Sequence, residues 1–107
     1  MYDGMDLAIV VYEAGLTTRV LAGNMCASSC FTVYAAGAKR EYEKGARIGV
    51  HSAIHDLEGE THSTKGYTVD LMRFLDALGV PASILGKLAI TEPQFMTWLT
   101  DEDLRLM

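Results

Sequence analysis

Apolar and polar positions alternate with a changing period along the chain, and each change of period marks a predicted element. In residues 4–14, four apolar side chains recur at helical spacing and Gly15 follows as a stop, which predicts a first helix. Residues 18–22 are predicted to form a short strand, because Thr18 and Val20 are β-branched. The apolar face of the first helix carries Met5, Ala8, Ile9 and Tyr12.

Residues 27–38 are almost entirely apolar, which predicts a second helix that is buried on most sides and closed by Gly37. Two short strands are predicted next, at residues 40–43 and 47–51. The order helix, strand, helix, strand predicts an α/β fold with a short parallel sheet and crossover helices. At most three or four strands are expected, so the sheet should leave a face or an edge uncovered.

The second half is predicted to be a polar loop followed by a helical C-terminal part. Residues 52–66 contain two glycines and several charged side chains, which indicates a loop or an exposed hairpin. Helical spacing returns after this loop and continues to Gly79, and Pro81 is predicted to open the next helix. Two shorter helices are predicted to begin at Pro93 and Thr100.

Composition limits the classes of function. The chain has 107 residues, half of them apolar, which is enough to form a buried core. A single domain over residues 1–107 is therefore predicted. Nine Lys and Arg against 14 Asp and Glu give a net charge of −5, which argues against nucleic-acid binding. No apolar run approaches the ~20 residues of a membrane span. No signal peptide is recognised, so a cytoplasmic location is expected unless a missing upstream segment directs export.

The strongest candidate for chemistry is the segment Met-Cys-Ala-Ser-Ser-Cys at residues 25–30, at a predicted strand-to-helix junction. A serine after a small residue at such a sharp turn is how several hydrolase folds expose a nucleophilic hydroxyl. The start of the next helix offers free backbone N–H groups to a developing oxyanion. His51, at the end of a predicted strand, is a candidate base. The alternative is that Ser28 or Ser29 only caps the helix, and that His51 only ends the strand.

Two cysteines, Cys26 and Cys30, flank this serine turn and are too few for a disulfide framework or a four-ligand zinc site. If the helix begins near Ala27, their Cα atoms lie about 6 Å apart, within the range that a disulfide tolerates. We expect two small buried hydrophobic side chains, with the disulfide as the alternative.

The three histidines of the sequence, His51, His55 and His62, are candidate metal ligands. His51 and His55 have helical spacing, but the pattern ends a strand at His51, where this spacing does not bring them together. Acidic side chains surround His55 and His62, which favours a solvated loop. We therefore expect no metal and no cofactor.

Four segments along the chain carry a recognisable pattern. They are residues 4–9 (Gly-Met-Asp-Leu-Ala-Ile), 26–29 (Cys-Ala-Ser-Ser), 36–40 (Ala-Gly-Ala-Lys-Arg) and 46–51 (Ala-Arg-Ile-Gly-Val-His). Taken in order, they resemble the Clp protease proteolytic subunit (ClpP) and its relatives in the ClpP/crotonase superfamily, above all divergent ClpP-like proteins with a Cys-Ala-Ser-Ala-Cys type motif. A further match at residues 98–104 is similar to the closing turn and helix of that family.

The resemblance implies a serine peptidase that cleaves a peptide or protein substrate through an acyl-enzyme. In it, Ser28 is the nucleophile, His51 is the general base and the backbone N–H of Ser29 is an oxyanion donor. The resemblance also implies a homo-oligomer that works with an AAA+ unfoldase. The chain itself carries no P-loop, so any ATP dependence is expected to belong to that partner.

Two features of the family have no counterpart in this sequence. The Gly-Gly pair of the family's oxyanion hole precedes the segment that matches residues 1–4, which predicts an N-terminally truncated fragment without the leading strands. The family's catalytic aspartate aligns with Met96, which cannot orient a histidine. A Ser–His dyad and a triad completed by another carboxylate, Glu92 or Asp101, therefore both stay open.

Two other functions are alternatives to a peptidase. One is a catalytically inactive interaction or assembly module of the same fold, in which Ser28 is a helix cap. The other is a crotonase-like acyl-CoA enzyme, in which paired backbone amides polarise a thioester. The pairing of Ser28 with His51 argues against the acyl-CoA enzyme, since such enzymes do not rely on a serine at this junction.

Overall fold

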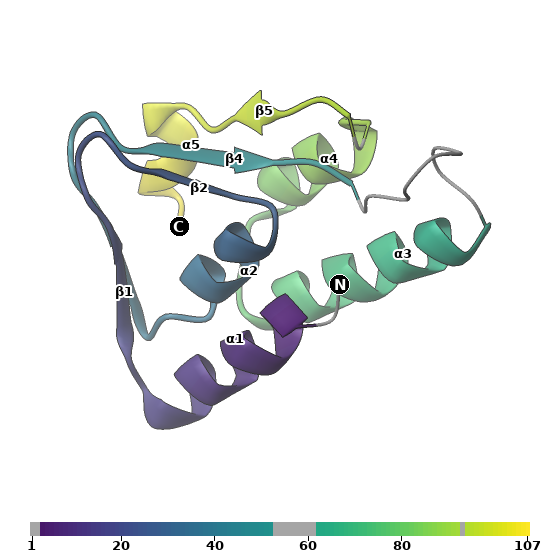
Figure 1. Cartoon of the computed structure of the whole chain (residues 1–107), viewed down its shortest axis with the longest axis horizontal. Helices are drawn as coiled ribbons and strands as arrows, with labels where there is room; N and C mark the ends of the chain where they lie inside the picture. The colour runs from purple at the N-terminus through teal and green to yellow at the C-terminus, as the bar shows by residue number, and fades with distance from the viewer. Residues whose placement is uncertain (1–2, 53–61, 93) are drawn as a thin grey trace. The chain divides into compact units, whose positions relative to one another are not determined.

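A computed structural model describes residues 3–52, 62–92 and 94–107 and shows an α/β protein (Figure 1). Within these ranges the helices are α1 (Asp3–Ala14), α2 (Ser29–Ala35), α3 (His62–Ala77), α4 (Ala82–Ile90) and α5 (Asp101–Arg105). The strands are β1 (Thr17–Val20), β2 (Met25–Ala27), β3 (Lys39–Tyr42), β4 (Arg47–Val50) and β5 (Thr97–Trp98). No helix among the described residues is both long enough and apolar enough to span a bilayer.

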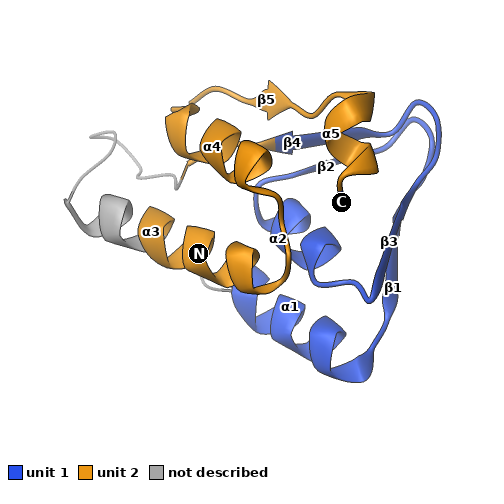
Figure 2. Ribbon diagram, turned by 180° about the vertical axis from the view of Figure 1, so that it is seen from behind, with its two compact units in different colours: residues 1–49, 107 blue, residues 50–106 orange. Residues whose placement is uncertain are grey.

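The chain divides into two units by packing. Unit 1 comprises residues 1–49 with Met107, and unit 2 comprises residues 50–106; Figure 2 colours them blue and orange. That residues 1–107 fold as one domain stays a prediction.

The five described strands form two sheets, a two-stranded one of order β1-β3 and a three-stranded one of order β2-β4-β5, rather than one short sheet of at most four strands. Two of the pairings are parallel, as predicted. β1 lies parallel to β3, with Thr17 opposite Lys39. β2 lies parallel to β4, with Ala27 opposite Gly49. The strand that enters the serine turn is β2, whereas the prediction placed that strand at residues 18–22. The three residues of β2 are too few to show an alternating pattern, which is why the sequence did not indicate it.

Helix α1 has the predicted length, but part of its predicted apolar face is wrong. The helix stops at Gly15, which has φ +65°. Ala8 and Val11 are buried, whereas Ile9 and Tyr12 are exposed. Helix α1 packs against α2, and the two helices come close together at Gly4. A Cβ added at Gly4, near the start of α1, would lie only 2.9 Å from the Cβ of Ser29, the first residue of α2.

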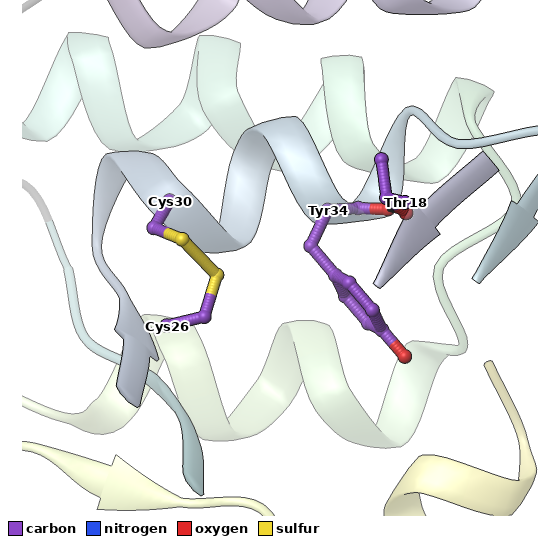
Figure 3. The surroundings of a disulfide bond; sticks show 4 residues. All are labelled: Thr18, Cys26, Cys30 and Tyr34. Atoms are coloured by element: carbon purple, nitrogen blue, oxygen red, sulfur yellow. Dashed lines mark hydrogen bonds between the residues drawn. A yellow bond between two sulfur atoms is a disulfide. The ribbon is translucent and has the colours of Figure 1, made fainter. Parts of the chain in front are cut away.

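Helix α2 ends earlier than predicted because its last carbonyls have partners from the neighbouring strands. The Thr18 hydroxyl donates to the Tyr34 carbonyl oxygen at 2.7 Å, and Nε of Arg40 donates to the Ala35 carbonyl oxygen at 3.0 Å. Figure 3 shows Thr18 at this end of the helix. A Cβ at Gly37, two residues after the end of α2, would lie 2.3 Å from the Thr18 hydroxyl oxygen, so this position requires glycine.

In unit 2 the predicted loop is wrong over residues 62–66, because α3 already begins at His62. The rest of that loop, residues 53–61, lies outside the described residues. The prediction treated Gly66 as a residue that ends a helix, but Gly66 lies within α3. A glycine inside a helix costs only about 1 kcal/mol relative to alanine, so the rest of a helix can outweigh it. Gly79, with φ +90°, ends the segment after α3, and Pro81 precedes α4 as predicted.

The predicted helix at residue 93 is wrong: residues 94–95 form a turn and bend and lead into β5, while Pro93 itself is outside the described residues. The helix at Thr100 is confirmed and is α5. Its capping box joins the Asp103 N–H to the Thr100 hydroxyl at 3.1 Å and the Thr100 N–H to the Asp103 carboxylate at 2.9 Å. The same carboxylate accepts a hydrogen bond from Lys87 of α4 at 2.5 Å. Asp103 therefore joins α4 to the start of α5.

The environment of Asp103 predicts a loss of stability in acid. Burial by itself raises the pKa of Asp103, but the hydrogen bonds from Lys87 and Thr100 outweigh it and hold this pKa below its usual range. A carboxylate with a lowered folded-state pKa contributes stability above its unfolded pKa, and the contribution is lost as the pH falls through the folded value. We expect Asp103→Asn to be less stable than wild type at neutral pH and to lose less stability on acidification to about pH 3.

Urea unfolding at the two pH values checks this expectation. Asp101→Asn changes an exposed residue in the same helical turn and should keep the acid dependence of wild type. Equal losses of stability in wild type and Asp103→Asn on acidification would contradict the assigned role of Asp103.

Candidate functional site

Ser28 connects β2 to α2 in an unusual backbone conformation, with φ +60° and ψ −124°. In the described part of the chain it is the one non-glycine residue with positive φ. At four other described positions that need positive φ, the chain uses glycine: Gly15, Gly23, Gly45 and Gly79. A side chain in such a region costs on the order of 1–3 kcal/mol, and residues of this kind cluster at functional sites.

Ser28 is an exposed residue, and its hydroxyl makes no capping hydrogen bond to α2. The first turn of the helix instead uses the Ser28 carbonyl oxygen, which accepts from the N–H groups of Phe31 at 3.0 Å and Thr32 at 3.4 Å. The alternative in which the Ser28 side chain serves as the helix cap is therefore not what the structure shows. The hydroxyl is free to meet another molecule.

Ser29 is the first residue of α2, and the first N–H groups of a helix have no carbonyl acceptor within that helix. No hydrogen bond from this N–H to a carbonyl is found within the described ranges. The position of Ser29 is set by Gly4, whose missing side chain leaves room for the Ser29 Cβ and hydroxyl. The start of α1 thus fixes the residue that follows the candidate nucleophile.

Cys26 and Cys30 form a disulfide across the serine turn, with their Cα atoms 5.1 Å apart (Figure 3). The expectation of two unlinked small side chains is wrong, and the alternative that their spacing allowed is correct. Cys26 is buried in β2, whereas Cys30 is exposed in the first turn of α2. The bridge closes a five-residue loop that contains Ser28. A bridge across a loop of this length lowers the entropy of the unfolded chain and so raises the free energy of unfolding by about 2 kcal/mol.

His51 follows β4 and is buried, with 7% of its surface exposed. Its Nδ1 atom lies 2.5 Å from the carbonyl oxygen of Ser52. Within the described residues, no group of three His, Cys, Asp or Glu is arranged to hold a metal ion. His55 and the side chain of His62 lie outside what the structure describes.

The three residues considered for the acid position all belong to unit 2. Met96 is half-buried directly before β5, and Glu92 and Asp101 are exposed. Glu92 accepts a hydrogen bond from the Gln94 side chain at 2.7 Å. The choice between a dyad and a completed triad is not decided by these positions.

Ser28 belongs to unit 1 and His51 to unit 2, and the structure describes each within its own unit. Both follow the carboxyl ends of strands that pair in parallel: Ala27 and Gly49 are register partners, Ser28 comes directly after Ala27, and His51 comes two residues after Gly49. In open α/β sheets, ligand-binding residues commonly follow the carboxyl ends of strands.

Comparisons with protein-family models, with curated proteins and with solved structures find no match for this chain. What can be stated is its class: an α/β protein with a serine in a left-handed turn between a strand and a helix. The resemblance to ClpP rests on the sequence motifs alone, and the function is accordingly a proposal.

The contact between Gly4 and Ser29 predicts that the serine turn does not tolerate a methyl group at residue 4. Gly4→Ala places a Cβ 2.9 Å from the Ser29 Cβ, so α1 and α2 must move apart, which we expect to cost about 1–3 kcal/mol. Gly86→Ala is the matched control, because Gly86 lies in helix α4 and an added Cβ there meets no atom within 4 Å. The control should gain up to about 1 kcal/mol.

Thermal unfolding followed by circular dichroism measures both changes. A Gly4→Ala protein as stable as wild type, beside a stabilised Gly86→Ala protein, would contradict the close packing at the serine turn.

Proposed function

We propose that the protein is a serine hydrolase of the ClpP-like peptidase type, with Ser28 as nucleophile and His51 as general base. The observation that carries this proposal is the backbone of Ser28, which is left-handed although the residue is not glycine. A glycine would adopt the same turn at lower cost, so a serine there needs a reason beyond the turn itself. An exposed hydroxyl with no capping bond supplies that reason.

In the proposed reaction, the Ser28 oxygen attacks the carbonyl carbon of a peptide bond while its proton passes to Nε2 of His51. Negative charge develops on the carbonyl oxygen, and the N–H of Ser29 donates to it. The same proton then moves from His51 to the leaving amine, which departs and leaves an acyl group on Ser28. A water molecule, deprotonated by His51, releases the acid and restores the hydroxyl.

The homo-oligomer and the AAA+ unfoldase belong to the proposal through the resemblance to the ClpP family. One observation supports association more directly: α1 exposes large apolar side chains at Leu7, Val10 and Tyr12. The same observation favours the second candidate function, a non-catalytic interaction or assembly module. The two candidates differ in whether Ser28 reacts.

The disulfide bears on the location of the protein. Disulfides persist in oxidising compartments and are rare in the reducing cytosol. The bridge between Cys26 and Cys30 therefore supports export of the protein over a cytoplasmic location.

An activity-based fluorophosphonate probe tests the proposed nucleophile. We expect covalent labelling of Ser28, because the probe phosphonylates serines activated by a base. Labelling should be lost in Ser28→Ala and kept in Ser29→Ala, which retains the backbone N–H. In His51→Gln the rate of labelling should fall by about 10²–10⁴-fold. Peptide mapping by mass spectrometry identifies the labelled residue.

A labelled Ser29 would reverse the assignment of the nucleophile. Absence of labelling in folded wild-type protein, under conditions that label a standard serine hydrolase, would decide for the non-catalytic module.

A further inference from the structure

The imidazole of His51 has a backbone carbonyl as its hydrogen-bond partner. Its Nδ1 atom lies 2.5 Å from the carbonyl oxygen of the next residue, Ser52. A carbonyl oxygen can accept a hydrogen bond but cannot donate one, so Nδ1 must carry the proton. In the neutral ring the lone pair is then on Nε2.

This tautomer is the one that a general base in a serine hydrolase needs. In a Ser–His–Asp triad, a carboxylate accepts from Nδ1–H and so leaves Nε2 free to take the serine proton. The resemblance places Met96 where that carboxylate is expected, and a thioether cannot fill the role.

We infer that the backbone carbonyl of Ser52 replaces the catalytic carboxylate as the acceptor that sets the tautomer of His51. Ser52 is thereby a positioning residue that acts through its main chain. The role of this tautomer in catalysis rests on the proposed function, whereas the tautomer itself does not.

The residue that carries this carbonyl is buried and is anchored through its N–H, which belongs to the preceding peptide group. The residue is 1% exposed, and its N–H donates to the Thr91 carbonyl oxygen at 2.9 Å. Thr91 is fixed in turn, because its hydroxyl donates to the Lys87 carbonyl oxygen at 2.6 Å and lies 2.6 Å from the hydroxyl oxygen of Thr97. The segment after β4 is thus tied to the end of α4 and to β5, within unit 2. Burial from water strengthens each of these hydrogen bonds.

The Ser52 side chain takes no part in this arrangement. Its hydroxyl is buried and has no hydrogen-bond partner among the described residues. Side-chain replacement therefore separates the main-chain role from a general role of this position in packing.

A neutral acceptor has a cost for catalysis. It orients the ring, but it lacks the negative charge with which a carboxylate stabilises the imidazolium. We expect a slow hydrolase whose deficit lies in kcat rather than in KM, because the missing interaction forms only as His51 takes up the proton.

The direct test is the ¹⁵N NMR spectrum of His51 in the full chain. A His55→Gln/His62→Gln variant leaves His51 as the one histidine, and the ¹⁵N shifts of its neutral ring report which nitrogen is protonated. We expect a protonated Nδ1 and an unprotonated Nε2, the reverse of the tautomer that free neutral histidine favours in water. A predominant Nε2–H form would overturn the inference.

An amide-to-ester exchange tests whether the Ser52 carbonyl is responsible. Lactic acid in place of Ala53 turns the Ser52 carbonyl into an ester carbonyl, a weaker acceptor, and changes no side chain. The Nδ1–H preference should fall in this protein and stay unchanged in Ser52→Ala, which keeps the amide. A preference unaffected by the ester, or one abolished in Ser52→Ala, would contradict the main-chain role.

The test of the His51 tautomer can fail or succeed independently of the test of Ser28 as a nucleophile. An Nδ1–H tautomer in a protein whose Ser28 fails to react would leave this assignment standing and reject the hydrolase. If the hydrolase is confirmed, Met96→Asp and Met96→Asn should have kcat values within about twofold of each other, because the Nδ1 proton already has an acceptor. A large gain confined to Met96→Asp would show that the carbonyl does not fill the role.

Discussion

The left-handed backbone of Ser28 is the constraint on which the rest of unit 1 depends. It reverses the chain between β2 and α2 within one residue and presents a hydroxyl to solvent. Contacts on both sides hold this turn: the Cys26–Cys30 bridge spans it, and Gly4 gives Ser29 the space to lie against α1. The caps from Thr18 and Arg40 then fix the opposite end of α2. A strained turn can persist because its surroundings determine it in this way.

The sequence predicted those parts of the fold that depend on local patterns. Gly15 and Gly79 end helical segments, and Thr100 begins one, because a left-handed residue or a capping side chain acts within a few positions of the chain. Features that depend on distant contacts were missed. The close approach of α1 to α2 at Gly4 is a contact between residues 25 positions apart, and the end of α2 is capped by side chains from strand residues.

At the candidate site, too, local patterns could be predicted from the sequence and features that depend on the folded backbone could not. A serine between small residues at a strand-to-helix junction can be recognised in the sequence, and so can a histidine that ends a strand. The sequence could not show that Ser28 has positive φ, because most non-glycine residues avoid that region. The spacing of Cys26 and Cys30 allowed a bridge without requiring one, and only the tight turn brings their Cα atoms to 5.1 Å. A backbone acceptor such as the Ser52 carbonyl leaves no signal in the sequence at all, since every residue has one.

The central claim is that Ser28 is kept in a costly conformation for its hydroxyl, and the Ser28→Gly variant tests it most directly. Glycine adopts φ +60° without strain, so we predict a free energy of unfolding about 1 kcal/mol higher than that of wild type. We also predict complete loss of hydrolysis of an activated ester substrate. Stability and hydrolysis are measured on the same samples. A Ser28→Gly protein that is no more stable than wild type and hydrolyses the ester at the wild-type rate would contradict the account.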